Sequence, residues 1–303
     1  MRVPDNLMTN RVITQLNSVT DQISKLQIQI SSGVRIQRPS DDPGGALRAA
    51  NLRSGIALVE NHQSVVKDSQ QWLKSEDSAL GSIQDTLRQI RNIGLQAGNT
   101  MDQPARDALK AQVDNLTKAL VQSANSTDGL RYVFAGYQST QPPFTDDGVT
   151  VQYNGDYGKK NVTIIDGVTL ELNHDGQEVF NAHAASDPSA PSGPDVFTTV
   201  RNLSSAIQTG DMTSINTYMA ELDDHISRVG TIRVETGTRL QQTELAGSRL
   251  EQSTEVLNSM LSDTEGTDLA EALVHLQEQQ NLYQAATYVG STLARAGLLD
   301  WIR

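Results

Sequence analysis

Six apolar residues near the start of the chain alternate at spacings of four and three, and this heptad pattern restricts the possible folds more than any other feature. The six are Val12, Leu16, Val19, Ile23, Leu26 and Ile30. Such spacing places them on one narrow stripe of an α-helix, as in a coiled coil. A short helix cannot bury such a stripe alone, so the segment needs a helical partner.

The stripe stops where the next heptad position would fall, and the segment "GVRIQRPSDDPGG" separates it from a second helical pattern. Asp42 is placed to act as an N-cap, and Pro43 suits the first helical position. A phosphate-binding loop is not expected, because no Gly-Lys-Ser/Thr follows and no apolar strand precedes. We interpret the segment as a joint between two helices, formed by Gly33, Arg35, Asp41, Asp42, Pro43, Gly44 and Gly45.

Beyond the joint, apolar heptad positions continue to near Gly94, within a helix expected over residues 43–98. A third helix is expected to follow, with Asp102 as the predicted cap and Pro104 in its first turn. The middle of the chain differs, since short β-branched runs are separated there by Asn-Gly and Asp-Gly turns, which predict hairpins. This stretch contains ten acidic and three basic residues. Helical spacing then returns.

The last helix is expected to begin at Thr267 or Asp268, with Glu271 placed for a capping box if Asp268 is the cap. Its apolar residues would pack against the N-terminal stripe and then against neighbouring subunits, because neither end can bury its stripe alone. The C-terminal candidates for assembly are Leu269, Leu273, Leu276, Tyr283, Val289, Leu293, Leu298, Leu299, Trp301 and Ile302.

These patterns predict a mainly α fold with a small β insert. We expect an elongated molecule whose long N- and C-terminal helices pack as a coiled-coil-like bundle, with a central β-rich domain. The predicted parts are an N-terminal heptad arm with the joint at 1–42, long helices at 43–127, a β-rich insert at 128–195, returning long helices at 196–262, and a C-terminal heptad arm at 263–303.

Composition argues against several classes of function. The net charge of −12 disfavours nucleic-acid binding, which needs clustered Lys and Arg. The chain has no cysteine and no apolar run near the ~18 residues of a membrane span. The stretch "MRVPDNLMTNRVITQLNSV" has no apolar core of signal-peptide length, so we expect no secretory signal. The five histidines of the chain form no HExxH motif or close pair. We therefore expect no enzyme activity, no metal and no cofactor.

Three separated blocks carry a family resemblance. The stretch "ISSGVRIQRPSDDPGGALRA" closely resembles the N-terminal signature of bacterial flagellins and their hook-associated relatives. "IRNIGLQAGNT" with "ARDALKAQVDNL" is similar to the helical region that follows in these proteins. Residues 267–302 resemble the C-terminal helix that the family shares. Within the family, the start "MRVPDNLMTNRVITQLN", the insert motif "RYVFAGYQSTQPPF" and the ending Leu-Leu-Asp-Trp are similar to the branch at the hook–filament junction.

The resemblance implies a structural adaptor rather than an enzyme. Such a protein is exported by the flagellar type III apparatus without a cleaved signal and is located outside the cell. Its partners would be other copies in a ring of about eleven, a second hook-associated junction protein, flagellin, and an export chaperone at the C-terminal region. Its terminal helices would order into a coiled-coil tube on assembly. No nucleic-acid binding or membrane insertion is implied.

Three possibilities stay open at the level of sequence. The helix near Arg88 and Arg91 broadly resembles the flagellin segment that an innate immune receptor recognises, although a solvated helix face is the simpler interpretation. The chain could be a short flagellin that forms the filament itself. It could also carry an enzyme in the insert, although the insert lacks a metalloprotease motif.

Overall fold

The computed structural model describes residues 5–98, 102–182 and 193–301 of the chain, with side chains described from residue 10 to residue 292 of those ranges. The chain divides into two compact units. Unit 1 comprises Met1–Leu58 and Ser253–Arg303, and unit 2 comprises Val59–Gln252. The fold is mainly helical with small antiparallel sheets, as predicted.

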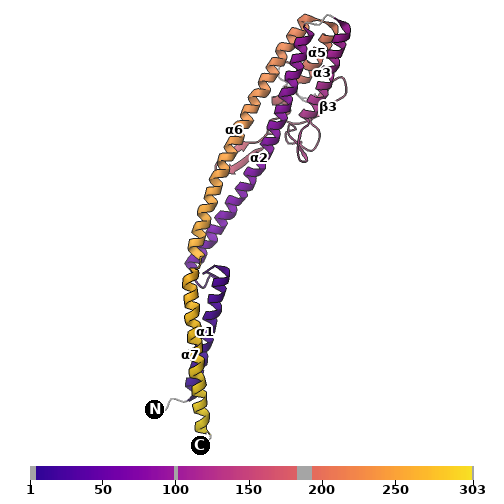
Figure 1. Cartoon of the computed structure of the whole chain (residues 1–303). Coiled ribbons are helices and arrows are strands. Elements are labelled where there is room, and N and C mark those ends of the chain that lie inside the picture. Colours follow the sequence, from indigo (N-terminus) through magenta and orange to yellow (C-terminus); the bar gives the residue numbers. More distant parts are fainter. Residues whose placement is uncertain (1–4, 99–101, 183–192, 302–303) are drawn as a thin grey trace. The chain divides into compact units, whose positions relative to one another are not determined.

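Unit 1 contains α1 (Asp5–Ser32) and α7 (Leu269–Trp301), which run antiparallel side by side (Figure 1). It also contains the beginning of α2 (Pro43–Ala97) and the end of α6 (Met212–Glu265), where a Leu257 methyl carbon lies 3.8 Å from the position of a Cβ on Gly55. The six residues of the N-terminal heptad stripe are all buried or half-buried. Between residues 10 and 32, Gln29 is the one other α1 residue whose side chain is half-buried.

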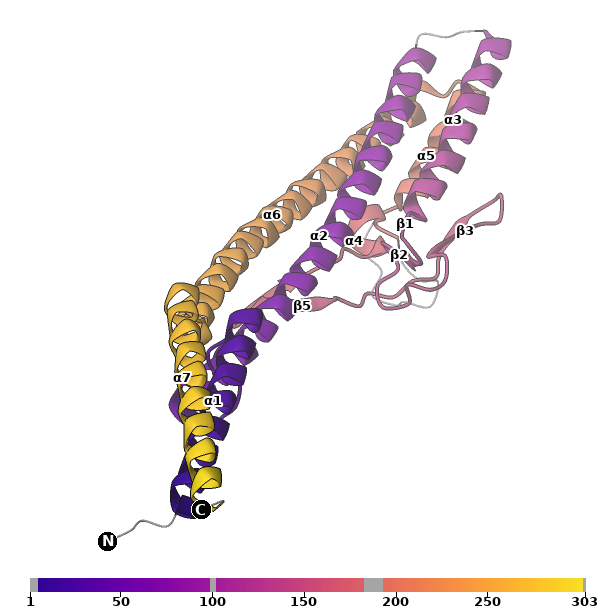
Figure 2. The same ribbon diagram turned by 60° about the horizontal axis from the view of Figure 1, so that its bottom comes forward.

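Unit 2 is built on the remaining lengths of α2 and α6, with α3 (Gln103–Ala124) and α5 (Val196–Thr209) lying side by side in both views (Figures 1 and 2). Among the described residues of unit 2, two ion pairs join α2 to α6, from Arg91 Nε to Asp223 Oδ1 at 2.5 Å and from Arg233 Nε to Asp77 Oδ1 at 2.9 Å. The helical segments expected from heptad spacing are therefore confirmed.

Polar residues interrupt the apolar seam of α6. Thr236 and Thr243 are fully buried there. Their hydroxyls donate hydrogen bonds to the carbonyl oxygens of Ile232 at 3.0 Å and Leu240 at 2.7 Å. These bonds within the helix let a hydroxyl occupy a buried position without leaving a donor unpaired.

The described residues of the insert form three two-stranded antiparallel hairpins, which confirms the predicted strand type. They pair β1 (Thr127–Asp128) with β2 (Arg131–Tyr132), β3 (Phe144–Asp146) with β4 (Val151–Tyr153), and β5 (Asn161–Ile165) with β6 (Val168–Glu171). Gly167, at the Asp-Gly turn between β5 and β6, has a φ of +80°, a conformation that glycine adopts without strain.

Two local features differ from the sequence-based expectation. A short helix, α4 (Gly176–Phe180), follows the hairpins, and a helix of five residues is too short to show a periodic pattern. Asp102 stands at the N-cap position of α3 as predicted, but its side chain makes no capping hydrogen bond. The expectation of a bonded cap at that position was therefore wrong.

All four phenylalanines of the chain lie in one buried cluster of unit 2. They are Phe134, Phe144, Phe180 and Phe197. Phe144 is central, with ring centroids 4.9 Å from Phe180 and 5.2 Å from Phe197. Because three of the four come from the insert or its short helix, the insert supplies core as well as surface.

No helix among the described residues is both long and apolar enough to cross a membrane.

Candidate functional site: the joint and the terminal helices

The joint begins with a glycine that ends α1. Gly33 has a φ of +70°, and its amide donates to the carbonyl oxygen of Gln29 at 2.8 Å. A left-handed residue directly after a helix turns the chain away from the helix axis, and glycine does so without a Cβ penalty. The end of the heptad stripe predicted at this residue is confirmed.

Asp42 caps the next helix as the sequence indicated. Its Oδ1 accepts a hydrogen bond from the amide of Gly45 at 2.9 Å, and α2 begins at Pro43. The hydrogen bond from Gly45, together with the Arg35 guanidinium 3.4 Å from Asp42 Oδ2, holds the pKa of Asp42 below its usual value. A lowered carboxyl pKa contributes stability at neutral pH that is lost as the pH falls below about 4.

Asp41 organises the turn itself. Its Oδ2 accepts from the amides of Gln37 at 3.2 Å and Arg38 at 3.0 Å, while Lys25 Nζ lies 2.8 Å from its Oδ1. The hydrogen bond from Lys25 is the main reason that the pKa of Asp41 is lowered. Asp41 therefore stabilises the turn, and Asp42 caps the start of α2.

The break between α6 and α7 lies directly beside this joint, which sequence reasoning missed. The amide of Arg35 donates to the carbonyl oxygen of Glu265 at 2.6 Å, and the amide of Thr267 donates to that of Gly33 at 3.0 Å. Val34 and Gly266 thereby form an antiparallel β-bridge. The only sequence signal was that "SDTEGTD" also interrupts a helix.

Side chains strengthen the pairing of the two breaks. Arg35 Nη2 donates to the carbonyl oxygen of Thr264 at 3.1 Å, and Arg53 Nη2 lies 2.5 Å from Glu265 Oε2. Asp268 caps α7, since its Oδ1 accepts from the amides of Ala270 and Glu271. The side chain of Glu271 lies 3.6 Å from His275 Nε2, and no described contact returns it to the cap, so half of the predicted capping box is formed.

The glycines of α2 differ in the space around them. A Cβ on Gly45 would lie 2.5 Å from both Ile36 Cδ1 and Asp42 Oδ2. A Cβ on Gly44 would meet only Asp42 Oδ1, at an ordinary 3.7 Å. A Cβ at position 45 would therefore displace the side chains of Ile36 and Asp42, whereas a Cβ at position 44 would displace neither.

The face of α7 that is covered in unit 1 is not the stripe that the sequence suggested. Leu269, Leu273, Tyr283 and Val289 are exposed, whereas Leu276 is half-buried. The buried or half-buried side chains of α7, within the part whose side chains are described, are Ala272, Leu276, Gln279, Gln280, Ala286 and Gly290. Apart from Gln280, these residues follow heptad spacing. The heptad position between Gln279 and Ala286 is Tyr283, which is exposed.

Small residues in this covered stripe bring α1 close. The position of a Cβ on Gly290 lies 3.3 Å from Val12 Cγ1. The larger apolar side chains of α7 consequently point elsewhere, and Leu273, Val274, Leu282 and Tyr288 are between 53% and 72% exposed. A helix that is apolar all round is normally buried all round, so α7 carries more apolar surface than α1 covers.

The remaining C-terminal candidates cannot be placed at the level of side chains. Leu293, Leu298, Leu299 and Trp301 belong to the helical segment whose side chains are not described, and Ile302 lies outside the described residues.

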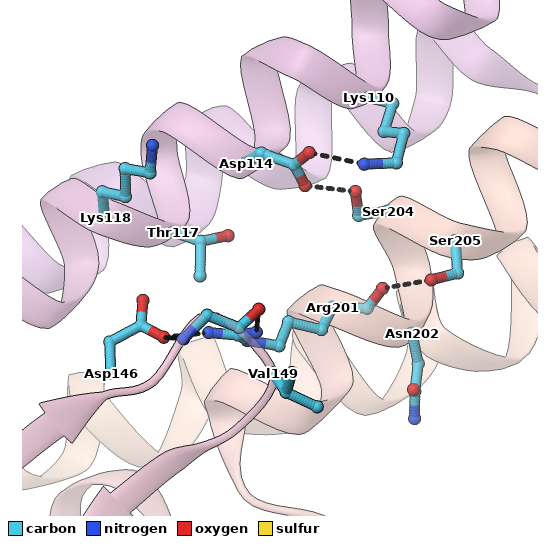
Figure 3. A pocket seen from close by; sticks show the side chains of 11 residues that line it. Lys110, Asp114, Thr117, Lys118, Asp146, Val149, Arg201, Asn202, Ser204 and Ser205 are labelled. Atoms are coloured by element: carbon cyan, nitrogen blue, oxygen red, sulfur yellow. Dashed lines mark hydrogen bonds and ion pairs between the residues drawn. The ribbon is translucent and has the colours of Figure 1, made fainter.

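A polar cavity of about 560 Å³ in unit 2 is the other concave feature that we considered as a site (Figure 3). Four of its five charged side chains are already paired, because Asp114 accepts from Lys110 Nζ and Ser204 Oγ at 2.6 Å each, and Arg201 pairs with Asp146 and donates to the carbonyl oxygen of Gly148. Lys118 is the fifth, and Figure 3 shows it without an interaction with the other residues drawn. The lining contains no histidine or cysteine, and the one hydroxyl that donates to a carboxylate there, that of Ser204, donates to Asp114, which Lys110 already pairs. In the described part of the chain, no group of three or more acidic or histidine side chains is arranged to hold a metal ion.

Comparison with protein families matches both ends of the chain. Residues 3–139 match the family model described as the bacterial flagellin N-terminal helical region, and residues 219–302 match that of the bacterial flagellin C-terminal helical region. The two matches include the joint, the α6–α7 break and both terminal helices.

Individual relatives and solved structures to which the chain is similar are also flagellar proteins. The chain is 28% identical to flagellar hook-associated protein 3 of Salmonella typhimurium over 260 residues, which covers 80% of this chain and 81% of the relative. It is 21% identical to flagellin of Bacillus subtilis over 295 residues, covering 94% of each. Among solved structures, that of a putative flagellar hook-associated protein from Vibrio parahaemolyticus superposes with a TM-score of 0.67 at 19% identity, covering 75% of this chain and 100% of that chain.

Proposed function

We propose that this chain, which belongs to the bacterial flagellin family, is a structural adaptor that joins the hook-associated ring of a flagellum to the flagellin filament. The observation that carries the proposal is the match to flagellar hook-associated protein 3 over four fifths of both chains. A short flagellin is the alternative, and the lower identity to flagellin of Bacillus subtilis makes it the weaker one.

The geometry of unit 1 suggests how the adaptor works. α1 covers one stripe of α7, while the other faces of α7 present Leu273, Leu282 and Tyr288 to solvent in the single chain. Helices with exposed apolar faces on several sides can pack between neighbours and form a continuous layer. We infer that the terminal helices of adjacent subunits bury these faces against one another when the subunits assemble.

Partners and location follow from the same proposal. The subunit would form a ring of about eleven copies, contacting a second hook-associated protein on one side and flagellin on the other. It would leave the cell by the flagellar export apparatus without a cleaved signal, with a chaperone on its C-terminal region, and reside at the hook–filament junction. The protein family consists of structural flagellar proteins, and we expect no enzyme activity.

Deletion of the gene tests the proposal directly. Cells that lack this chain should build hooks that fail to retain filaments and should release flagellin into the medium, as measured by electron microscopy and by immunoblotting of culture supernatants. Normal filaments in the deletion strain would refute the junction role. Growth of long filaments from the purified chain after seeding would instead favour the flagellin alternative.

The two glycines of the joint provide a matched pair of variants. Gly45→Ala should reduce the number of filament-bearing cells in a complemented deletion strain, because overpacking at the cap typically costs about 1–3 kcal/mol. Gly44→Ala should retain filaments, since its Cβ has room and alanine favours a helix by about 0.5–1 kcal/mol over glycine. Equal filament counts for the two variants, at equal amounts of exported protein, would contradict the role assigned to the joint.

A further inference from the structure

A buried histidine of unit 2 lies between carboxylates from two different helices. His174, which is 2% exposed, follows β6 and directly precedes the cap of α4. Its Nδ1 lies 3.1 Å from Oε1 of Glu76 on α2, and its own amide donates to the same oxygen at 2.9 Å. Its Nε2 lies 3.4 Å from Oε2 of Glu235 on α6, at ion-pair distance without hydrogen-bond geometry.

The protonation state of the His174 ring decides whether it can donate a hydrogen bond to one helix or to two. A neutral imidazole carries a proton on only one nitrogen, whereas the imidazolium ion carries one on each. Glu76 is fully buried, and its Oε2 has no hydrogen-bond partner among the described residues. A buried carboxylate with so few partners depends strongly on the charge of the ring beside it.

The groups surrounding His174 are mostly acidic. The insert contributes three further carboxylates, and the permanent cations that pair with them are Lys159 of the insert and Arg239 of α6. The three carboxylates are Glu171, Asp175 and Glu178. With Glu76 and Glu235, five carboxylates therefore face two permanent cations, and a protonated His174 offsets part of this excess of negative charge.

The electrostatic balance at the ring favours its charged form. Burial lowers the pKa of His174, but the hydrogen bond and charge of Glu76, aided by Glu178, outweigh both burial and the nearby Arg239, so the pKa is raised above its ordinary value. A raised histidine pKa contributes stability that is fully present below about pH 6.5. That contribution is lost as the pH rises through the folded-state pKa.

We propose that His174 is a pH-dependent latch that fastens the β-rich insert to α2 and α6. In its doubly protonated form the ring bridges Glu76 and Glu235. When it loses a proton, the bridge to one helix is lost and the segment from residue 172 to residue 180 loosens. Glu171, Asp175, Glu178, Lys159 and Arg239 set the pH of release.

Two measurements on the full-length chain test the latch. Nuclear magnetic resonance of ¹³C-labelled histidine, assigned with single His→Gln variants, gives the titration midpoint of each histidine. Hydrogen exchange, expressed as protection factors to remove the intrinsic effect of pH, follows the amides of residues 172–180. We expect the His174 midpoint to lie above about 6.5 and the protection to fall roughly tenfold as the pH rises one unit through it.

Glu235→Gln is the informative variant because Glu235 is half exposed and its loss leaves the core intact. Its His174 midpoint should fall by up to about one unit, and the loss of protection should move with it. Glu76→Gln should lower the midpoint further if the variant folds. His225, which is buried on α6 and whose pKa is lowered mainly by burial, provides an internal reference that Glu235→Gln should leave unchanged.

Two results would overturn the latch. One is a His174 midpoint at or below the ordinary histidine value. The other is protection of residues 172–180 that stays constant while His174 titrates, or that does not shift with the midpoint in Glu235→Gln.

Discussion

Cells whose only copy of this chain carries Leu273→Asp together with Val289→Asp are expected to be almost devoid of filaments. Both side chains are about half exposed in the single chain and lie off the covered stripe of α7. The substitutions should therefore leave the pairing of α1 with α7 intact. Burial of an unpaired carboxylate between subunits costs several kcal/mol, which is enough to prevent assembly when repeated in every subunit.

Electron microscopy of a complemented deletion strain would measure this effect, with immunoblotting to show that the variant is still exported. The matched control is Gln277→Asp together with Asn281→Asp, which adds the same charge to α7 at exposed positions that are already polar. We expect the control to retain most filaments. If both double variants behave alike, net charge on α7 rather than its apolar surface determines assembly.

Phe144→Ala is expected to be the most destabilising single substitution among the aromatic residues of unit 2. Its ring is 2% exposed and contacts Phe180, Phe197 and Tyr153, and its backbone is bonded at both polar groups to the side chain of Asn125. Truncation of a buried phenylalanine typically costs about 3–5 kcal/mol, because it loses apolar burial and leaves a cavity.

Urea denaturation followed by circular dichroism would measure the change in the free energy of unfolding. Leu130→Ala is the control, since Leu130 lies in the turn between β1 and β2 and is 93% exposed. We expect it to change stability by no more than about 0.5 kcal/mol. A loss below about 1 kcal/mol for Phe144→Ala would show that the four phenylalanines do not form the principal core of the insert.

Local chemistry made much of the joint predictable. Gly33 ends a heptad stripe, and Asp42 with Pro43 starts a helix, because helix ends need groups that satisfy free amides and carbonyls within a few residues. The same reasoning placed the start of α7 at Thr267 or Asp268, and Asp268 is the residue that caps it. That reasoning erred at Asp102, where the residue type and position suited a cap but no bond formed.

Local chemistry could not predict that the joint bonds to the break between α6 and α7. Arg35 and Glu265 lie 230 residues apart in the sequence, and neither has a periodic or spacing signal that points to the other. The assembly candidates on α7 show the same limit. Leu269 and Leu273 suggested the stripe that packs on α1, yet Ala272 and Gly290 occupy it, because small side chains permit a close approach.

By itself the sequence determined the helical ends, the hairpin insert and the positions of the breaks, since these depend on periodicity, turn residues and caps within short windows. Only the tertiary structure decided which face of α7 is covered, that the two breaks bond to each other, and that His174 stands between Glu76 and Glu235. The physical reason is that these relations are set by how closely distant backbones can approach, and small residues and buried charges control that approach without leaving a local pattern.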